Sequence, residues 1–285
     1  MPAKTVKDLI EFNNTVPDEF KVKVKVDYVK RASGYSVIRA NYCSYDGQPI
    51  DSDSPLRAKY YEESDLDWWR KYGVEKASSH GLTRYNEPKK EGKLLYPWGS
   101  AYCKENRKKQ DFPCHNAWFI GTTDTAKGYG PMLYDCLIVK LGEYGFGLTA
   151  DRSLVSELAA NVWLNYYTTR SDVTKKLLDI NRDSDDTEDD CYAEHESDPY
   201  WNRWVKDPEE KDFKDDEKGF QDTKKKREIM RKAVNYAYFD NGISTLDELK
   251  QADLLIDEGG MNESYIIKGL YESFLQDIKS FKSKD

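Results

Sequence analysis

Apolar and polar residues alternate strictly at the start of the stretch FKVKVKVDYVKRASGYSVIRANY, residues 20–42. Because alternation places every second side chain on the same face of a β-strand, the pattern predicts a strand with one apolar face. The run Ala32-Ser33-Gly34 interrupts the alternation, and a second β-rich run follows it. The stretch therefore predicts an antiparallel hairpin.

A strand followed by a helix is predicted twice in succession in the middle of the chain. AWFIGTT (117–123) and FGLTADR (146–152) are short β-prone runs. SLVSELAANVWLNYYTT (153–169) has the pattern of an amphipathic helix, for which Ser153 or Ser156 is a suitable N-cap. Between the two β-prone runs, apolar residues recur near a 3.6-residue spacing, at Leu133, Cys136, Leu137, Val139 and Leu141. This order predicts a parallel or mixed part of a sheet.

The remainder of the chain is less periodic. Residues 43–110 carry several prolines and one short predicted helix, SDLDWWRKYG (64–73). The acidic and charged stretch 181–223 predicts a linker or loop, and helical spacing beyond it predicts a helical C-terminal extension over 224–285. A first domain is therefore expected over residues 1–180.

Charge and hydropathy limit the classes of partner. Lysine and arginine total 44 and aspartate and glutamate total 52, which gives a net charge of −8. Such a charge argues against a general affinity for nucleic acid or for an anionic membrane. The basic cluster between Lys224 and Lys232 could contact nucleic acid, but the acidic stretch just upstream is a nearer partner of opposite charge and is favoured. Since the chain has no apolar run of 18 residues, we expect a soluble, intracellular protein that does not enter a membrane.

The cysteines and acidic residues do not form a convincing metal site. Five cysteines without CxxC spacing are typical of reduced thiols rather than of a disulfide framework. Cys114 and His115 are adjacent, but no further ligand lies at a useful spacing, so a structural role is favoured. The stretch 179–190 has the opening spacing of a calcium loop without its central glycine or its final glutamate, which favours a solvated acidic loop.

The stretch TAKGYGP, residues 125–131, separates the first β-prone run from the helix that follows it. A helix N-terminus has unpaired N–H groups and the positive end of the helix dipole, and Gly128 and Gly130 leave these groups uncovered. Lys127 adds a positive charge, and Pro131 suits the first helical turn because its missing N–H is not needed there. The pattern predicts an anion site. Neither GxGxxG nor the Gly-Lys-Ser/Thr end of a P-loop is present, and a turn without a ligand is the alternative.

Residues 117–169 as a whole resemble the core of the GCN5-related N-acetyltransferase superfamily. In that family a strand leads into an Arg/Gln-x-x-Gly-x-Gly/Ala loop, then a helix, a strand and a second helix. Here the two glycines of the loop are in register, Lys127 stands where lysine is common, and Thr125 replaces the usual Arg or Gln. The segment KGYGPMLYD, followed by GLTADRSLVSELAANVWLNYY, looks like the corresponding segments of GNAT-like proteins encoded by tailed bacteriophages.

The resemblance implies a fold and a set of binding residues. The fold would be α/β (α+β), with a mixed, mostly antiparallel twisted sheet flanked by helices. Acetyl-CoA would be the co-substrate, with its pyrophosphate on the loop and its pantetheine arm paired with the strand backbone from Trp118 to Ile120. The implied loop residues are Lys127, Gly128, Tyr129, Gly130 and Pro131.

The catalytic residues of the family match less well. Its second helix reads Asn-x-x-Ala-x-x-x-Tyr, and the tyrosine often protonates the leaving thiolate. Ser156 begins the corresponding run here and Trp163 stands at the tyrosine position, so Tyr166, about one turn further on, is the candidate acid. By sequence position alone, the candidate bases are Asp124, Asp151 and Glu157.

Two functions remain open at this point. The first is an acyl-CoA-dependent N-acetyltransferase that acts on an unidentified amine. The second is a non-catalytic structural or interaction protein on the same fold, such as a virion component. Fold similarity alone does not decide between them.

Overall fold

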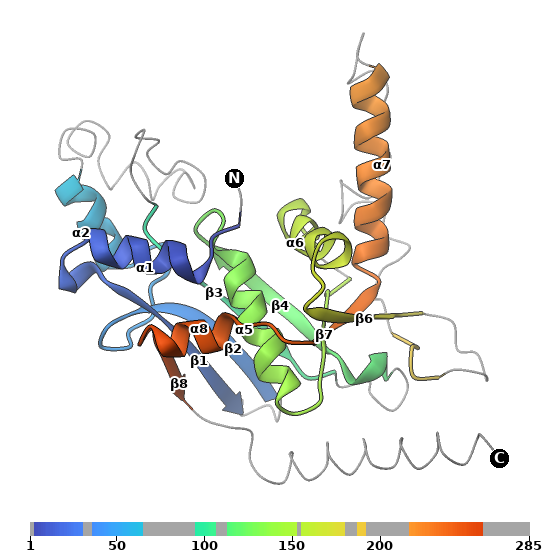
Figure 1. Ribbon diagram of the computed structural model, residues 1–285, viewed down its shortest axis with the longest axis horizontal. Coiled ribbons are helices and arrows are strands. Elements are labelled where there is room, and N and C mark those ends of the chain that lie inside the picture. Colours follow the sequence, from blue (N-terminus) through green and yellow to red (C-terminus); the bar gives the residue numbers. More distant parts are fainter. Residues whose placement is uncertain are drawn as a thin grey trace.

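The structure is a computed structural model, which describes residues 3–30, 36–64, 95–106, 113–152, 155–179, 187–191 and 217–258. These residues form a mixed, mostly antiparallel sheet in the order β6-β7-β5-β4-β3-β2-β1-β8, flanked by helices (Figure 1). The α+β fold class is therefore confirmed. The strands are β1 (Val22–Lys30), β2 (Ser36–Ser44), β3 (Gly99–Lys104), β4 (Trp118–Thr125), β5 (Leu148–Thr149), β6 (Val173–Leu177), β7 (Tyr236–Asp240) and β8 (Leu255–Glu258).

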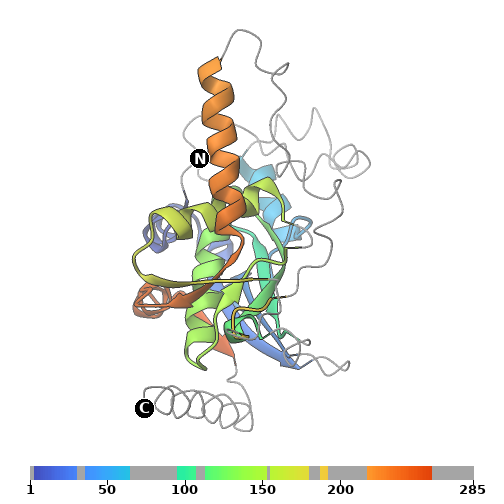
Figure 2. The same ribbon diagram turned by 90° about the vertical axis from the view of Figure 1, so that its right-hand side faces the viewer.

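The helices lie mainly on one side of this sheet. They are α1 (Val6–Thr15), α2 (Pro55–Ser64), α5 (Gly130–Gly142), α6 (Glu157–Thr168), α7 (Glu217–Ala233) and α8 (Thr245–Gln251), with short 3-10 turns η1 (Asp18–Phe20) and η3 (Cys114–Asn116). Figure 2 shows α1, α5 and α8 together on one face, whereas α7 projects away from the sheet. Among the described residues, no helix combines the length and the apolar character needed to cross a membrane.

The N-terminal strands and the strand–helix repeat form as predicted. β1 and β2 are antiparallel, from Val22↔Ser44 to Lys30↔Ser36. β4 and β5 are parallel, and α5 connects them as the pattern required. Ser156 caps α6, because its side chain accepts a hydrogen bond from the N–H of Ala159. The predicted helices at 64–73 and 262–281 and most of the predicted linker lie outside the described residues.

Helix α5 is the central helix of the protein. A helix that is apolar on all sides must be enclosed by other elements. Its buried residues are Gly130, Met132, Leu133, Tyr134, Asp135, Cys136, Leu137, Ile138, Lys140 and Leu141. Asp135 is thus a carboxylate in the core, and it needs hydrogen-bond donors and a positive charge from neighbouring elements.

Three elements supply hydrogen bonds to Asp135. Tyr166 of α6 donates its hydroxyl proton at 2.5 Å, Arg170 donates at 3.0 and 3.2 Å, and Thr245 of α8 donates at 2.9 Å. Burial raises the pKa of Asp135, and the nearby Arg170 opposes that rise. The Arg170 guanidinium also pairs with Asp172, at 2.6 Å. This network joins α5 to α6, to the start of β6 and to α8.

The prediction of a separate, wholly helical C-terminal extension is wrong for residues 236–258. β7 lies between β5 and β6, and β8 pairs in parallel with β1 at the opposite edge of the sheet. The apolar run YAYFD lies within the predicted extension, and a run this short has no clear period that distinguishes a strand from a helix. Tertiary pairing with β5 makes it a strand. Residues 1–180 therefore do not form a complete domain.

The expectation of five reduced thiols is also wrong. Cys114 and Cys191 form a disulfide across 77 residues, whereas Cys43, Cys103 and Cys136 are free and buried. The spacing of the cysteines along the chain does not indicate this bond, because Cys114 and Cys191 meet only in the assembled fold.

Replacement of Arg170 by methionine should lower the free energy of unfolding by about 3 kcal/mol, because it leaves the Asp135 carboxylate buried without a cation. Urea unfolding would measure the loss. Burial already raises the pKa of Asp135, and removal of Arg170 should raise it further. The loss in free energy of unfolding should therefore be complete at neutral pH and become smaller as the pH falls and Asp135 is protonated.

Lys59→Met is the matched control for this variant. Lys59 and Glu19 form an ion pair at 3.3 Å in which both side chains are about half exposed. Its loss should cost no more than about 0.5 kcal/mol. Equal losses for the two variants would contradict a special role for the Asp135 network.

Candidate functional site

The candidate site begins where β4 leads into α5. β4 ends at Thr125, and the chain turns through Ala126 to Tyr129 before the helix starts at Gly130. The Ala126 N–H donates to the Trp98 carbonyl, and the Tyr129 N–H donates to the Ala126 carbonyl, both at 3.0 Å. Gly128 has φ +91°, a left-handed conformation that glycine adopts without strain. These contacts fix the position of the helix N-terminus.

In the part of the chain that the structure describes, no side chain caps this N-terminus. Pro131 occupies the first helical turn, as predicted, and the side chain of Lys127 is exposed. Tyr129 differs from the expectation, because its side chain is buried and its hydroxyl donates to the Leu95 carbonyl at 3.3 Å. Its main-chain groups are engaged as well, since its N–H donates to the Ala126 carbonyl and its carbonyl accepts from the Tyr42 hydroxyl at 2.9 Å. The exposed cation beside the start of α5 is therefore Lys127.

Thr125 lies directly beside the first residue of the helix. A Cβ added to Gly130 would lie 3.2 Å from Thr125 Oγ1. The threonine that replaces the Arg or Gln of the family loop is therefore at the helix N-terminus, but it carries a hydroxyl rather than a charge.

The N-terminal segment of the chain also contacts this loop. The Lys4 N–H donates to the Gly128 carbonyl at 2.9 Å, and Lys4 Nζ pairs with Asp8 at 2.9 Å. Sequence reasoning missed this contact. The available signal was Thr5-Val-Lys-Asp8, a capping box that starts α1 and so orients the residues before it.

The second half of the site is the free edge of β4. β4 pairs with β5 at Trp118↔Leu148 and Phe119↔Thr149 only, and no other described strand pairs with β4 on that side. The Trp118 N–H donates to the Gly147 carbonyl at 2.8 Å. The prediction that Trp118 offers its backbone to a ligand is therefore wrong. No described strand pairs with this side of β4 from Ile120 to Thr123, and the Ile120 side chain is buried.

A β-bulge lies just beyond the last residue that pairs with β5. Ala101 pairs with Thr123 and Cys103 with Ile120, so Gly121 and Thr122 together oppose Tyr102. A Cβ at Gly121 would lie 2.2 Å from the Tyr102 ring, which explains the glycine. Bulges bend a strand and increase its twist. β4 therefore turns away from β5 where its edge becomes free, and a glycine within a predicted strand was the sequence signal.

The candidate acid lies elsewhere. Tyr166 is 1% exposed and donates its proton to Asp135. Burial and the neighbouring Asp135 carboxylate hold the pKa of Tyr166 well above its ordinary value. Trp163 is fully buried and stacks on Tyr238 with ring centroids 5.2 Å apart. Both side chains serve the core, so the geometry does not favour either as a proton donor to a ligand on β4.

The three candidate bases are not brought together. Asp124 lies on β4 opposite Ser100, close to the loop. Asp151 follows β5 and pairs with Lys104 at 3.5 Å. Glu157 is exposed in the first turn of α6. Asp124 alone is on the strand with the free edge.

Comparison with known proteins adds no relative. The chain matches no protein-family model, and no curated protein or solved structure is significantly similar to it. Within the described ranges, no group of three or more His, Cys, Asp or Glu side chains is placed to hold a metal ion. The function is therefore argued from geometry.

Tyr166→Phe should lower the free energy of unfolding by about 2 kcal/mol, because it removes a hydrogen bond to a buried carboxylate. Chemical denaturation would measure it. Tyr45→Phe is the control, since Tyr45 is exposed and its ring, which faces Lys23, is retained. A Tyr166→Phe protein of unchanged stability would show that the hydroxyl is not engaged as described.

Proposed function

We propose that the chain binds an acyl-CoA at the free edge of β4 and the N-terminus of α5, and that it transfers the acetyl group to an amine. One observation carries the proposal: a part of β4, Ile120 to Thr123, that pairs with no described strand on its β5 side is followed, through the turn Ala126–Tyr129, by a helix N-terminus without a side-chain cap among the described residues. An acyl-CoA carries matching groups in the same order. Its arm has amide groups that could pair with a strand, and the arm is followed by a pyrophosphate that could lie at a helix N-terminus.

Main-chain geometry supports binding of the arm. An extended ligand adds to an exposed strand edge through N–H and C=O groups, without a need for particular side chains. The stretch from Ile120 to Thr123 is about 10 Å long at the usual rise per residue. The bulge at Gly121 bends this stretch just beyond Phe119, the last residue that pairs with β5.

The electrostatics support binding of the phosphates. The α5 N-terminus carries the positive end of the helix dipole without a side-chain cap among the described residues, and Lys127 is exposed beside it. The hydrogen bond from Lys4 to Gly128 keeps the loop in this conformation. Thr125 provides a hydroxyl where the resembling family has a charged or amide side chain, so we expect weaker phosphate binding than that family achieves.

The chemistry would be direct attack by the amine nitrogen on the thioester carbonyl. The thioester supplies an activated acyl group. The chain would orient it through the β4 backbone, and Asp124 is the candidate to accept the proton of the attacking amine. Since Tyr166 is committed to Asp135, the leaving thiolate would take its proton from water.

A second function is favoured by one specific observation. Trp163 and Tyr166 both lie in the core, so neither the residue at the family's tyrosine position nor the candidate acid is placed as a general acid. The fold would then serve as a non-catalytic structural or interaction protein. Binding of acetyl-CoA without turnover of any amine would favour this alternative.

Isothermal titration with acetyl-CoA tests the proposal. The folded protein should bind it, and Gly128→Ala should weaken binding by at least tenfold, because alanine strains the left-handed position that shapes the loop. Gly145→Ala is the matched control, since Gly145 has φ +75° with nothing within 4 Å and lies beyond the other end of α5. It should lose similar stability and keep its affinity. Absence of binding at about 1 mM acetyl-CoA would refute the proposal.

Thr125→Arg should strengthen acetyl-CoA binding by about tenfold, the value of one additional charge-assisted hydrogen bond. Its long side chain can reach solvent from the half-buried position. Thr122→Arg is the control, because Thr122 is exposed on the same strand but is not beside Gly130. An equal gain for both variants would indicate non-specific attraction of an anion.

A further inference from the structure

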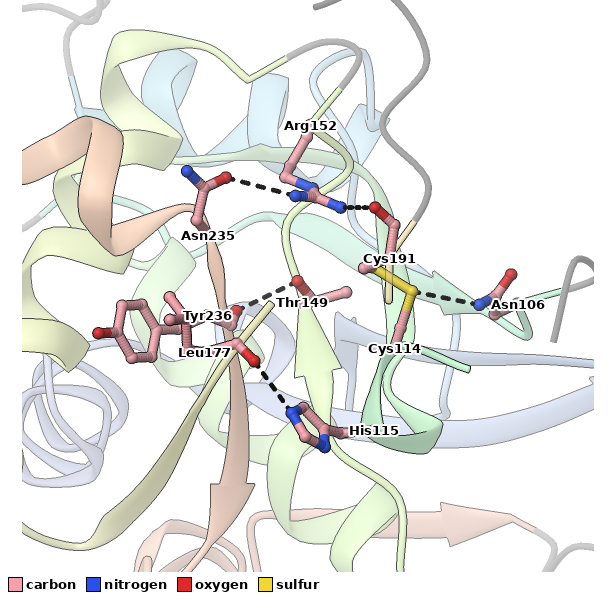
Figure 3. Close-up of a disulfide and its surroundings, with 9 residues drawn as sticks. All are labelled: Asn106, Cys114, His115, Thr149, Arg152, Leu177, Cys191, Asn235 and Tyr236. Carbon is pink, nitrogen blue, oxygen red and sulfur yellow. Dashed lines mark hydrogen bonds between the residues drawn. A yellow bond between two sulfur atoms is a disulfide. The ribbon is translucent and has the colours of Figure 1, made fainter. Parts of the chain in front are cut away.

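The disulfide joins the turn before β4 to Cys191 and lies near Thr149 of β5 and Arg152 (Figure 3). Cys114 belongs to η3, which leads into β4. Arg152, three residues beyond β5, donates to the Cys191 carbonyl and to Asn235 Oδ1. The disulfide is therefore connected both to the residues before β4 and, through Arg152, to the residues after β5.

We infer that the Cys114–Cys191 disulfide is a redox latch that holds the β4–β5 junction in its present geometry and releases it when the bond is reduced. The inference concerns the junction itself. Its effect on acyl-CoA binding rests on the proposed function.

The first support is the backbone of η3. Cys114, His115 and Asn116 have φ of +47°, +50° and +62°, a run of left-handed residues without a glycine. Such a run is strained and persists only where its surroundings hold it. The Cys114 N–H donates to the Asp190 carbonyl at 2.8 Å, and the His115 N–H donates to the Glu188 carbonyl at 2.7 Å. The segment that carries Cys191 is thus what holds the turn.

That segment, residues 187–191, is also hydrogen-bonded to Asp179, two residues beyond β6. The Asp179 N–H donates to the Asp189 carbonyl at 2.8 Å, and the Cys191 N–H donates to the Asp179 carbonyl. Cys191 packs in a small apolar cluster, separate from the main core, that also contains Cys114, Ala117, Leu178 and Ala237. The segment depends on the covalent bond more than an element of the main core would.

Two unsatisfied polar atoms weaken the same place. His115 bonds to the Leu177 carbonyl through Nε2 at 2.9 Å, but its buried Nδ1 has no hydrogen-bond partner among the described residues. Asp190 is 3% exposed, and its Oδ1 likewise has no partner there. Since unpaired buried polar groups favour an open state in which water reaches them, the non-covalent contacts alone hold the junction weakly.

Reduction would proceed by exchange with a dithiol. A thiolate of the dithiol attacks one sulfur of the bond, and its second thiol releases the protein thiols while the dithiol closes to its own disulfide. Two electrons and two protons pass to Cys114 and Cys191. Both cysteines are fully buried, so the dithiol reaches them when residues 187–191 open, and the reaction should be slow.

After reduction, both strands lose a constraint. The left-handed turn before Trp118 relaxes when residues 187–191 leave, and Arg152 loses its acceptor on Cys191. The two pairs that join β4 to β5, Trp118↔Leu148 and Phe119↔Thr149, are too few to keep the junction closed by themselves. The separation of the two strands then changes.

Hydrogen exchange of the full chain, before and after treatment with dithiothreitol, tests the latch. A thiol count in denaturant should rise from three to five. Exchange should accelerate at least tenfold at amides 114–119 and 147–149, with α5 still protected, and reoxidation should restore the initial rates. The Cys114→Ser/Cys191→Ser variant should exchange like the reduced protein with or without dithiol. Cys43→Ser, which changes a free cysteine on β2, should respond like the unaltered chain.

Three results would overturn the inference: five thiols in protein purified without reductant, unchanged exchange after reduction, or loss of α5 protection together with the junction. The last result would make the bond a global stabiliser instead of a latch. Titration of both redox forms with acetyl-CoA separates the two proposals. Failure of both forms to bind refutes the proposed function and leaves the exchange result to decide on the latch.

Discussion

The carboxylate of Asp135, enclosed in the central helix, is the constraint on which the arrangement of the other elements depends. An ionised group in an apolar interior needs a cation and several donors, and these come from parts of the chain far apart in sequence. Arg170 fixes the end of α6 and the start of β6, and Thr245 fixes α8. The requirement thus brings the C-terminal elements onto the same helix that presents the candidate anion site.

The candidate site follows from where regular pairing stops. A two-residue β5 and a bulge at Gly121 end the parallel pairing early, and the helix that begins at Gly130 directs its dipole toward the vacated edge. No specialised side chain is required for either feature. The candidate site therefore depends on the course of the main chain more than on which side chains stand at Thr125 and Trp163.

Local patterns predicted the hairpin, the strand–helix repeat and the Ser156 cap, because each depends on residues within a few positions of one another. They did not predict β7, β8 or the bond between Cys114 and Cys191, which exist only through partners distant in the chain. The candidate site divides in the same way. The glycines of the loop are visible in the sequence. The unpaired part of β4, in contrast, depends on how far β5 extends, and the burial of Tyr166 depends on its hydrogen bond to Asp135.

The positions of β7 and β8 have a consequence for synthesis of the chain. Residues 236–258 supply one strand beside β5 and another beside β1, near opposite margins of the sheet. During translation, β1 is made about 230 residues before its partner β8, and β5 about 90 residues before its partner β7, by the numbering of the pairs. Such distant pairings slow folding and leave apolar strand edges exposed meanwhile. A nascent chain of this kind would benefit from a chaperone that shields β1 and β5 until the sheet can close.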